Sequence, residues 1–474
     1  MMADRTLVVD LDGTLIRSDM LVESFWAACG QHWSAPLQAV ATGLRGRAAM
    51  KQRLGALGPV DAAGLPYNAA VLDYIARWRA AGGRTALVTA ATQGLADRVG
   101  AHLGIFDEVH GSSATENLKG AAKAAFLTGR FGAGGFDYIG DAEVDLPVWA
   151  AAQKAIVVGA SAAFLQRVKS LGGEVEAVAA PPHSPRAYLR ALRPHQWLKN
   201  LLVFLPILAA HQMHAPSLAR ALLAFVAFSL IASSVYVVND LVDLASDRAH
   251  PRKRQRPFAS GAIPLTHGTA MAPALLLAGL AVALPLGPRF LAVMLEYYAL
   301  TTAYSFYFKR RLVVDIIMLA GLYTLRIVAG GVATHIPLSV WLLAFSVFFF
   351  FALAAVKRQA ELVDGVTTGR GKVAGRGYVP EDLPLVEMMA TSSGFVSVLV
   401  MALYLSSPEV TKLYHHPTAL WGICVVLLYW ISRVVMLTHR GQMTDDPVVF
   451  ATKDYVSLGC GLAIAACALS GALL

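Results

Sequence analysis

Cysteine is scarce in this sequence, and the few cysteines follow no pattern of metal ligands. The 474 residues include four, namely Cys29, Cys424, Cys460 and Cys467. The last three lie inside apolar runs, where a cysteine usually behaves as a small apolar residue. We therefore expect no disulfide bond and no metal centre built from thiolates.

Charged residues are also few, at 15% of the chain against 56% hydrophobic residues. The segment from Met1 to Asp12 lacks the apolar core and cleavage site of a signal peptide, so we expect the first part of the chain to stay in the cytosol. From Trp197 onward, apolar runs of about 20 residues follow one another, each long enough to cross a bilayer. We predict a soluble domain at 1–180, a proline-containing linker at 181–187 and a membrane domain at 188–474.

The membrane domain is predicted to be all-α, with roughly nine spans. They lie near residues 198–212, 217–238, 268–286, 289–307, 313–333, 337–356, 385–405, 416–438 and 455–473. Lysine and arginine gather in the loops after the second, fourth, sixth and eighth spans. The loops on the other side of the membrane have few basic residues besides Arg220, Arg289 and Lys412. By the positive-inside rule the basic loops are cytosolic. This predicts a multi-pass protein of the inner (cytoplasmic) membrane, with the soluble domain and the acidic loops cytosolic and the C-terminus outside.

The net charge of +9 lies largely in these loops. A basic membrane face indicates anionic headgroups and phosphate-bearing substrates as partners, rather than nucleic acid.

Acidic and hydroxyl side chains follow short apolar runs in the soluble domain. Asp10 and Asp12 directly follow one such run, Thr89 ends a second, and Asp141 ends a third. Runs of this kind are typical of buried parallel strands. Because ligands bind at the carboxyl ends of the strands in an open α/β sheet, we expect these side chains to form one site.

The soluble domain resembles the haloacid dehalogenase-like (HAD) hydrolases, specifically the phosphatases with an aspartate nucleophile. The resemblance covers residues 5 to about 160 and rests on Asp10-Leu11-Asp12-Gly13-Thr14, Thr89, Lys119 and Gly140-Asp141, with Asp145 four residues on. It implies a Rossmann-like α/β fold, with a small helical cap between Thr14 and Arg84.

The same resemblance implies a role for each of these residues. Asp10 would attack phosphorus to form an aspartyl-phosphate, and Asp12 would act as general acid and then as general base. Thr89 and Lys119 would stabilise the phosphoryl oxygens. Mg²⁺ would be held by Asp10, Asp141 and the backbone carbonyl of Asp12, with support from Asp145, and the substrate would also meet Gly13 and Thr14.

An acidic motif follows the second predicted span. Asn239, Asp240, Asp243 and Asp247 lie within nine residues, and the offsets of three and four would stack the carboxylates on one face of a helix. Like charges at this spacing repel, so the motif needs cations such as Mg²⁺, which usually arrives with a diphosphate. The basic residues that follow suit a metal-bound diphosphate, while a solvated acidic loop is the alternative reading. They are Arg248, Arg252, Lys253, Arg254 and Arg256.

This motif resembles that of the UbiA superfamily of intramembrane prenyltransferases, and the resemblance covers residues 190–474. The family usually has a second motif, Asp-x-x-x-Asp, after the sixth span. In this chain the corresponding segment, Lys357–Asp364, has Glu361 and Asp364 instead. This departure counts against an ordinary aromatic prenyltransferase that binds an allylic diphosphate through two aspartate-rich motifs.

Further segments resemble the decaprenyl-phosphate phosphoribosyltransferases within this superfamily. They are Leu192–Asn200, Tyr304–Lys309, Asp315, Leu325–Gly331 and Asp445–Phe450. The resemblance implies that phosphoribosyl pyrophosphate is the donor and a polyprenyl phosphate the acceptor. The phosphate of the lipid would attack C1 of the ribose, and pyrophosphate would leave with Mg²⁺.

For that reaction Asp240, Asp243 and Asp247 would hold Mg²⁺ on the pyrophosphate, with Asn239 orienting them. Arg326 lies mid-span, so we expect it to have an internal partner. Positive-inside anchoring is the alternative for any single basic residue. Glu361 and Asp364 would bind a second Mg²⁺ or the ribose hydroxyls, and Arg326 is also expected to contact substrate. The expected phosphate contacts are Arg248, Lys253, Arg254, Arg256, Lys199, Lys309, Lys357 and Arg358.

The fusion of the two domains predicts a bifunctional enzyme. A phosphoribosyl transfer would leave a ribose 5-phosphate on the lipid, and a tethered phosphatase could remove that phosphate to give polyprenyl-phosphoryl-ribose for envelope glycans. One alternative is a prenyltransferase that uses a prenyl diphosphate and an aromatic or quinone precursor, with an independent phosphatase. Another is a transporter or lipid-binding protein with a regulatory HAD-like domain.

Overall fold

The structure is a computed structural model that describes residues 5–113, 117–179, 184–367, 377–443 and 446–473. The chain folds as two compact units. The first comprises Met1–Leu192 and Tyr236–Ala272, and the second comprises Arg193–Val235 and Pro273–Leu474. The segment with the acidic motif therefore groups with the N-terminal residues. Residues 181–183 of the predicted linker lie outside the described residues.

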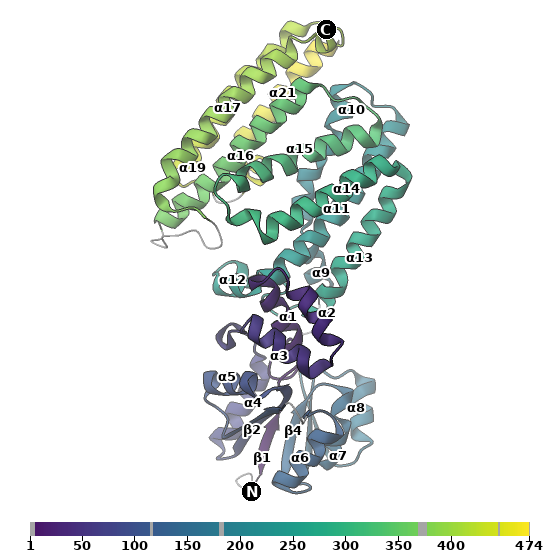
Figure 1. Cartoon of the computed structure of the whole chain (residues 1–474), viewed down its shortest axis with the longest axis vertical. Helices are drawn as coiled ribbons and strands as arrows, with labels where there is room; N and C mark the ends of the chain where they lie inside the picture. Colours follow the sequence, from purple (N-terminus) through teal and green to yellow (C-terminus); the bar gives the residue numbers. More distant parts are fainter. Residues whose placement is uncertain (1–4, 114–116, 180–183, 368–376, 444–445, 474) are drawn as a thin grey trace. The chain divides into compact units, whose positions relative to one another are not determined.

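A parallel sheet of six strands forms the centre of the first unit, with the order β3-β2-β1-β4-β5-β6. Its central strands β2, β1 and β4 are labelled in Figure 1. The strands are β1 (Thr6–Val9), β2 (Arg84–Thr92), β3 (Glu108–Ser112), β4 (Phe136–Gly140), β5 (Lys154–Val158) and β6 (Glu174–Val178). The apolar runs predicted as strands form β1, β2, β4 and β5. The two outer strands, β3 and β6, were not predicted.

Helices cover both faces of this sheet. Leu7 and Val9 of β1 pack in one apolar cluster with residues of α4 (Ala69–Ala80) and α5 (Gln93–Leu103). Val8 points the other way and packs in a second cluster. That cluster includes residues of α6 (Ala121–Phe131), α7 (Leu146–Ala151) and α8 (Ala162–Lys169). Because side chains alternate along a strand, a strand covered on both faces is apolar throughout, which explains the continuous runs.

The register of the sheet sets the position of the expected site. Val9 pairs with Leu87 of β2 and with Ile139 of β4. The residues that follow β1 and β4, including Asp10 and Asp141, therefore emerge at the same edge of the sheet.

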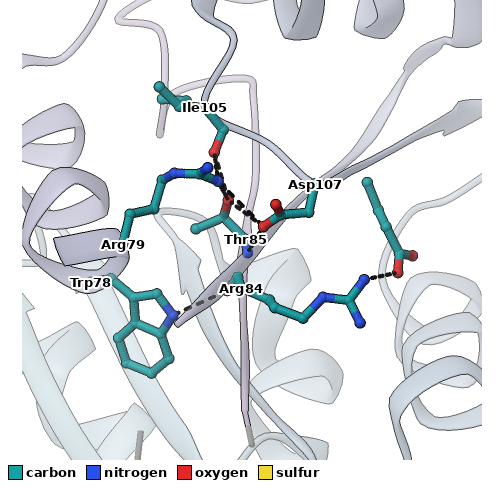
Figure 2. A network of polar contacts seen from close by, with 7 residues as sticks. Trp78, Arg79, Arg84, Thr85, Ile105 and Asp107 are labelled. Atoms are coloured by element: carbon teal, nitrogen blue, oxygen red, sulfur yellow. Dashed lines mark hydrogen bonds and ion pairs between the residues drawn. The ribbon is translucent and has the colours of Figure 1, made fainter. Parts of the chain in front are cut away.

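A polar network fixes the other end of β2 (Figure 2). Arg79 donates to Thr85 Oγ1 at 2.9 Å, to the Ile105 carbonyl at 2.7 Å and to Asp107 Oδ2 at 3.2 Å. The Thr85 backbone N–H donates to the same Asp107 oxygen at 2.8 Å. These bonds tie the start of β2 to the segment before β3.

The predicted helical cap is present between β1 and α4. It consists of α1 (Met20–Gln31), α2 (Ala35–Gly43) and α3 (Arg47–Leu57), followed by a 3₁₀ turn at Ala62–Gly64. Asp19 is the N-cap of α1, and its carboxylate accepts from the backbone N–H groups of Leu21 and Val22.

The second segment of the first unit lies against this cap. It contains the end of α11 (Ala215–Val242), then α12 (Leu244–Ala249) and the beginning of α13 (Leu265–Ala283). Trp26 Nε1 of α1 donates to Thr269 Oγ1 of α13 at 3.0 Å. Tyr188 of α9 (Pro185–Leu192) is hydrogen bonded to His267 Nδ1 at 2.7 Å.

The second unit is built from long apolar helices. Besides the first part of α11 and the last part of α13, it contains α14 (Pro288–Phe306), α15 (Val314–Thr334), α16 (Val340–Thr367), α17 (Leu383–Leu405), α19 (Trp421–His439) and α21 (Tyr455–Leu473). One apolar cluster of the described residues joins α15, α16, α17 and α19. Within it the rings of Tyr323 and Phe350 stack with centroids 4.9 Å apart.

Seven helical stretches of the described residues are long and apolar enough to cross a membrane, so the predicted count of nine is not confirmed. The stretches are Ala215–Val242, Leu265–Leu286, Val314–Thr334, Val340–Thr367, Pro380–Leu405, Pro417–His439 and Tyr455–Leu473. The predicted span near 198–212 is instead a 3₁₀ helix, Pro194–Phe204, followed by the short α10 (Leu205–Ala209) with Pro206 in its first turn. The predicted span near 289–307 forms α14, but it is not among the seven.

Candidate active sites

Three carboxylates meet at the carboxyl edge of the sheet. Asp10, Asp141 and Asp145 each offer one oxygen, and these oxygens lie within 4.8 Å of one another. Burial, together with the charge of Asp10, raises the pKa of Asp141 to about 7 and that of Asp145 to about 6. A hard divalent cation fits this set, because it takes oxygen ligands and relieves the repulsion between them.

The lysine that reaches these carboxylates is Lys123 and not Lys119. Lys123 Nζ, almost fully buried, lies 2.7 Å from Asp10 Oδ1 and donates to the Tyr138 hydroxyl at 2.9 Å. Tyr138 in turn donates to Asp145 Oδ1 at 3.0 Å. The side chain of Lys119 is exposed, because it lies in the loop that ends at Gly120, before α6 begins. The positive charge expected from Lys119 is thus supplied to Asp10 by Lys123, four residues later.

Asp12, two residues after Asp10, has a hydrogen-bond partner and a raised pKa of its own. Its Oδ1 accepts the backbone N–H of Met20 at 2.7 Å. Burial, followed by the charges of Asp19 and Asp10, raises the pKa of the Asp12 carboxyl to about 7. A carboxyl that is half protonated near neutral pH can both donate and accept a proton, as a general acid and base must.

The loop after β1 is shaped to bring Asp141 close. Gly13 has φ +73°, which strains any other residue, and a Cβ on it would lie 2.2 Å from Asp141 Oδ2, so a side chain there would displace the Asp141 carboxylate. Thr14 Oγ1 donates to Asp141 Oδ1 at 3.0 Å. Thr89, on β2, is fully buried, and its hydroxyl accepts the Ala91 backbone N–H at 3.0 Å.

The acidic motif in the first unit spans the end of one helix and the next. Asp240 lies in α11, Asp243 is the N-cap residue of α12, and Asp247 lies in α12. The Asp243 N–H donates to the Asn239 carbonyl, and the Asp247 N–H donates to the Asp243 carbonyl, so the helical hydrogen-bond spacing continues through the motif. The helix itself is interrupted at Asp243, between α11 and α12. Asp240 and Asp247 are buried, and Asp243 is half-buried.

Arg256 bridges two carboxylates of this motif. Its Nη1 lies 3.2 Å from Asp240 Oδ1 and 2.6 Å from Asp247 Oδ2. Burial raises the pKa of Asp247, and the guanidinium of Arg256 opposes that rise. The carboxylates thus have the donor chemistry for Mg²⁺, and an arginine neutralises part of their charge. Arg256 was expected to bind phosphate, whereas the structure pairs it with carboxylates.

Arg248 has protein partners as well. Its guanidinium binds both carboxylate oxygens of Glu23, at 3.0 and 2.7 Å, and its Nε donates to the Ala259 carbonyl at 3.1 Å. The predicted contact of Arg248 with substrate is therefore not supported, because these acceptors occupy its guanidinium. Lys253 and Arg254 are exposed.

In the second unit two lysines share one carboxylate. Lys199 Nζ lies 2.7 Å and Lys357 Nζ 3.0 Å from Asp446 Oδ2, and Lys199 also lies over the ring of Tyr323. Burial disfavours the charged form of Asp446, but Lys357 and Lys199 outweigh it and hold the pKa of Asp446 well below its usual value. Among these three described side chains, two cations on one anion leave a net positive charge. The neighbouring Asp445 lies outside the described residues.

Arg358, next to Lys357, is buried in a separate network. Its Nε lies 2.6 Å from Asp315 Oδ2, its Nη1 pairs with Glu361, and its Nη2 donates to the Tyr304 hydroxyl at 3.3 Å. Tyr378 donates to the other Asp315 oxygen at 2.6 Å. Arg358 was expected to contact phosphate and Glu361 to bind Mg²⁺ or ribose. In this structure the two side chains form an ion pair with each other instead.

Arg326 has the internal partners expected of a charge within a span. Its Nε donates to Asn200 Oδ1 at 3.0 Å, its Nη2 donates to the Tyr297 hydroxyl at 3.2 Å, and its Nη1 donates to the Leu322 carbonyl. It also lies over the ring of Phe228. Of the remaining predicted contacts, Lys309 is half-buried and Asp364 is exposed.

Several residues of these clusters were not predicted from the sequence, among them Glu23, Lys123, Tyr138 and Tyr323. Lys123 had a usable signal, because it lies four residues after Lys119 in the same predicted region. Glu23 had none, because its partner Arg248 is 225 residues away.

Comparisons with known proteins agree with this division of the chain. The model of the UbiA prenyltransferase family matches residues 200–453, and that of the haloacid dehalogenase-like hydrolases matches residues 7–149. The uncharacterized protein y4nM of Sinorhizobium fredii is 40% identical over 464 residues, which cover 97% of this chain and 89% of that protein. The nodulation protein NoeC of Azorhizobium caulinodans is 38% identical over 59% of this chain and 91% of its own length.

A third relative is the decaprenyl-phosphate phosphoribosyltransferase of Mycobacterium tuberculosis, 42% identical over 200 residues, or 41% of this chain and 66% of that enzyme. Among solved structures, a UbiA homolog from Archaeoglobus fulgidus bound to GPP and Mg²⁺ is 17% identical, covers 60% of this chain and 99% of its own, and has a TM-score of 0.47. The chain belongs to the UbiA prenyltransferase family, as a multi-pass membrane protein with an N-terminal haloacid dehalogenase-like domain.

Proposed function

We propose that this protein is a bifunctional membrane enzyme that makes a polyprenyl-phosphoryl-ribose for envelope glycans. In the first reaction, an oxygen of a polyprenyl phosphate bonds to C1 of phosphoribosyl pyrophosphate while the bond from C1 to pyrophosphate breaks. In the second, water hydrolyses the 5-phosphate of the lipid-linked ribose. The observation that carries the proposal is a phosphatase-type carboxylate cluster on a chain 42% identical, over 200 residues, to a decaprenyl-phosphate phosphoribosyltransferase. Such a transferase would leave a phosphate monoester for the second site.

For the transfer, Asp240, Asp243 and Asp247 would hold Mg²⁺, with Asn239 orienting them. The bound ion would supply positive charge to the leaving pyrophosphate. Arg256, which now neutralises Asp240 and Asp247, would become available to phosphate when a metal takes over those carboxylates. Its planar guanidinium suits a phosphate.

Lys199 and Lys357 would bind a second phosphate group in the same reaction. Together with their shared partner Asp446, these described side chains carry a summed charge of plus one, which favours an anion. Arg358 and Arg326, in contrast, are buried among protein partners, and we assign them to holding α15 and α16 in place.

For the hydrolysis, Asp10 would attack phosphorus and the ribose 5-oxygen would leave with a proton from Asp12. Asp12 would then take a proton from the water that cleaves the aspartyl-phosphate. Its pKa of about 7 suits both steps at neutral pH. Lys123 and Thr89 would stabilise the phosphoryl oxygens, and Asp10, Asp141 and Asp145 would hold Mg²⁺.

The test uses purified full-length protein in detergent with Mg²⁺, ribose-labelled phosphoribosyl pyrophosphate and a polyprenyl phosphate. Wild type should give lipid-linked ribose, and Asp10→Asn should accumulate the lipid-linked 5-phosphate. Asp73→Asn is a matched control, because Asp73 is an exposed carboxylate on α4 of the same unit.

Two results would count against the proposal. If no label enters lipid with any variant, the donor is wrong, and prenyl diphosphates with aromatic acceptors become the next substrates to assay. If Asp10→Asn makes the same dephosphorylated lipid as wild type, the phosphatase acts on another substrate.

A further inference from the structure

A buried ion pair within the first unit joins the cap of the phosphatase domain to the acidic motif. Glu23 lies on α1 of the cap, and Arg248 lies on α12, directly after Asp247. The two side chains are only 3% and 9% exposed, and both carboxylate oxygens are engaged. An arginine that pairs with a carboxylate through two parallel bonds is held in orientation as well as in place.

Arg248 holds α12 through more than this pair. Its Nε donates to the Ala259 carbonyl at 3.1 Å, so one guanidinium connects the cap, α12 and the turn beyond it. Close packing supports the same junction. A Cβ on Gly30 of α1 would lie 2.8 Å from the carbonyl oxygen of Val242, which ends α11. The helix boundary that carries Asp240, Asp243 and Asp247 is therefore packed directly on the cap.

Glu23 is also tied to the loop that carries Asp12, through the same Oε1 that Arg248 Nη2 binds. Ser18 Oγ donates to Glu23 Oε1 at 2.7 Å, and the Ser18 carbonyl accepts the Gly13 backbone N–H at 3.1 Å. Glu23 is thus fixed from the phosphatase side before it meets Arg248. It can transmit a defined position to α12, because both ends of the connection are made by short hydrogen bonds.

We infer that Glu23 is a positioning residue for the transferase: it orients Arg248 and α12 so that Asp240 and Asp247 are set for Mg²⁺. This inference rests on the proposed function, in which those aspartates hold the metal. The phosphatase domain thereby supports the metal site of the transferase in addition to its own reaction. Glu23→Gln would leave Arg248 as a buried cation without its carboxylate. That cation would then compete with Mg²⁺ for the neighbouring acidic side chains.

The experiment measures the Mg²⁺ dependence of phosphoribosyl transfer to lipid in wild type, Glu23→Gln, Glu23→Asp and the control Asp73→Asn. Partners that orient metal ligands typically change metal affinity by about 10- to 100-fold when removed. We expect Glu23→Gln to raise the half-saturating Mg²⁺ concentration by that factor. Most of the wild-type kcat should return at saturating Mg²⁺, because the aspartates themselves are unchanged. Glu23→Asp should recover part of the affinity, and Asp73→Asn should match wild type.

A binding measurement gives a second readout that needs no substrate. Mn²⁺ titrations followed by electron paramagnetic resonance, in an Asp141→Asn background that weakens the phosphatase site, should show weaker binding when Glu23→Gln is added. If wild type transfers no label, the proposed function fails, and this titration still decides the inference. Unchanged metal affinity in Glu23→Gln would overturn the inference, and so would a loss of kcat and thermal stability at an unchanged Mg²⁺ requirement.

Discussion

Replacing Lys123 by methionine removes one buried cation from the phosphatase site at nearly constant side-chain volume. Lys123 Nζ lies 2.7 Å from Asp10 Oδ1 and 2.9 Å from the Tyr138 hydroxyl, and the lysine side chain is 3% exposed. The variant leaves Asp10 beside Asp141 and Asp145 without this charge. Loss of one preorganised stabilising group in an active site costs about 2.7–4 kcal/mol, or roughly 10²- to 10³-fold in kcat. We expect Lys123→Met to lose phosphatase activity by that factor.

The assay is Mg²⁺-dependent hydrolysis of p-nitrophenyl phosphate by full-length protein. Lys119→Met is the matched control, because it makes the same change at an exposed position four residues away, and its activity should stay within about twofold of wild type. Removing one partner of a buried pair can destabilise by about 3–5 kcal/mol, so each variant is assayed below its own measured melting temperature. The reasoning is refuted if Lys119→Met loses activity and Lys123→Met keeps it.

Three further predictions follow from the same contacts. Mn²⁺ affinity of the Asp10–Asp141–Asp145 site should rise with pH up to about 7, because bound ligands must be ionised and burial raises the pKa of Asp141 to about 7 and of Asp145 to about 6. The stability of the metal-free protein should depend on pH in the opposite direction. The raised pKa values stabilise the fold below about pH 4, and that contribution is lost as the pH rises through about 7. Metal titrations and melting curves that do not vary with pH would contradict both expectations. Gly13→Ala places a Cβ 2.2 Å from Asp141 Oδ2 at φ +73°, so hydrolysis of p-nitrophenyl phosphate should be lost while far-ultraviolet circular dichroism stays that of the wild type. Asp446→Asn leaves Lys199 and Lys357 without their shared carboxylate and should destabilise the protein in detergent by about 3–5 kcal/mol, with part of the loss restored by added pyrophosphate; an unchanged melting temperature would argue against the pairing.

The central strands and their terminal carboxylates could be predicted from the sequence, because β1, β2, β4 and β5 are largely buried and read as continuous apolar runs. The outer strands could not. β6 contains Glu174 and Glu176, both paired with Lys154, and its residues are exposed or half-buried. An outer strand with mixed polarity shows neither the continuous run of a buried strand nor a clear alternation, so its pattern matches a loop equally well.

The partners of the basic residues were the least predictable part of the sites. Arg248, Arg256 and Arg358 were expected to bind phosphate, and each pairs with a carboxylate of the protein instead. A local pattern shows that a cation is present, but the carboxylate it meets depends on the fold. Lys119 and Lys123 make the same point within one region, because the start of α6 after Gly120 decides which lysine faces Asp10.

The two spans that were not confirmed have a different cause. Pro206 lies in the first turn of α10, and the residues before it form a 3₁₀ helix, so the apolar run near 198–212 is not one continuous helix. The segment near 289–307 does form a continuous helix, but Arg289 and Glu296 lower its apolar character. A count of apolar residues within a window thus does not register the proline break in the first segment, and it gives little weight to the two charges in the second.

The expected ligand sites share one physical feature: each carries a counter-ion from the protein itself. Lys123 pairs with Asp10, Arg256 with Asp240 and Asp247, and Asp446 with Lys199 and Lys357. Unpaired charges at such burial would cost several kcal/mol each, so the chain needs these partners in order to fold without its ligands. Ligand binding at Arg256 or Asp446 then becomes an exchange of partners, in which a metal or a phosphate replaces a side chain of the protein. The net affinity is the difference between two strong interactions, and it therefore depends on residues such as Glu23 that only set the geometry of the exchange.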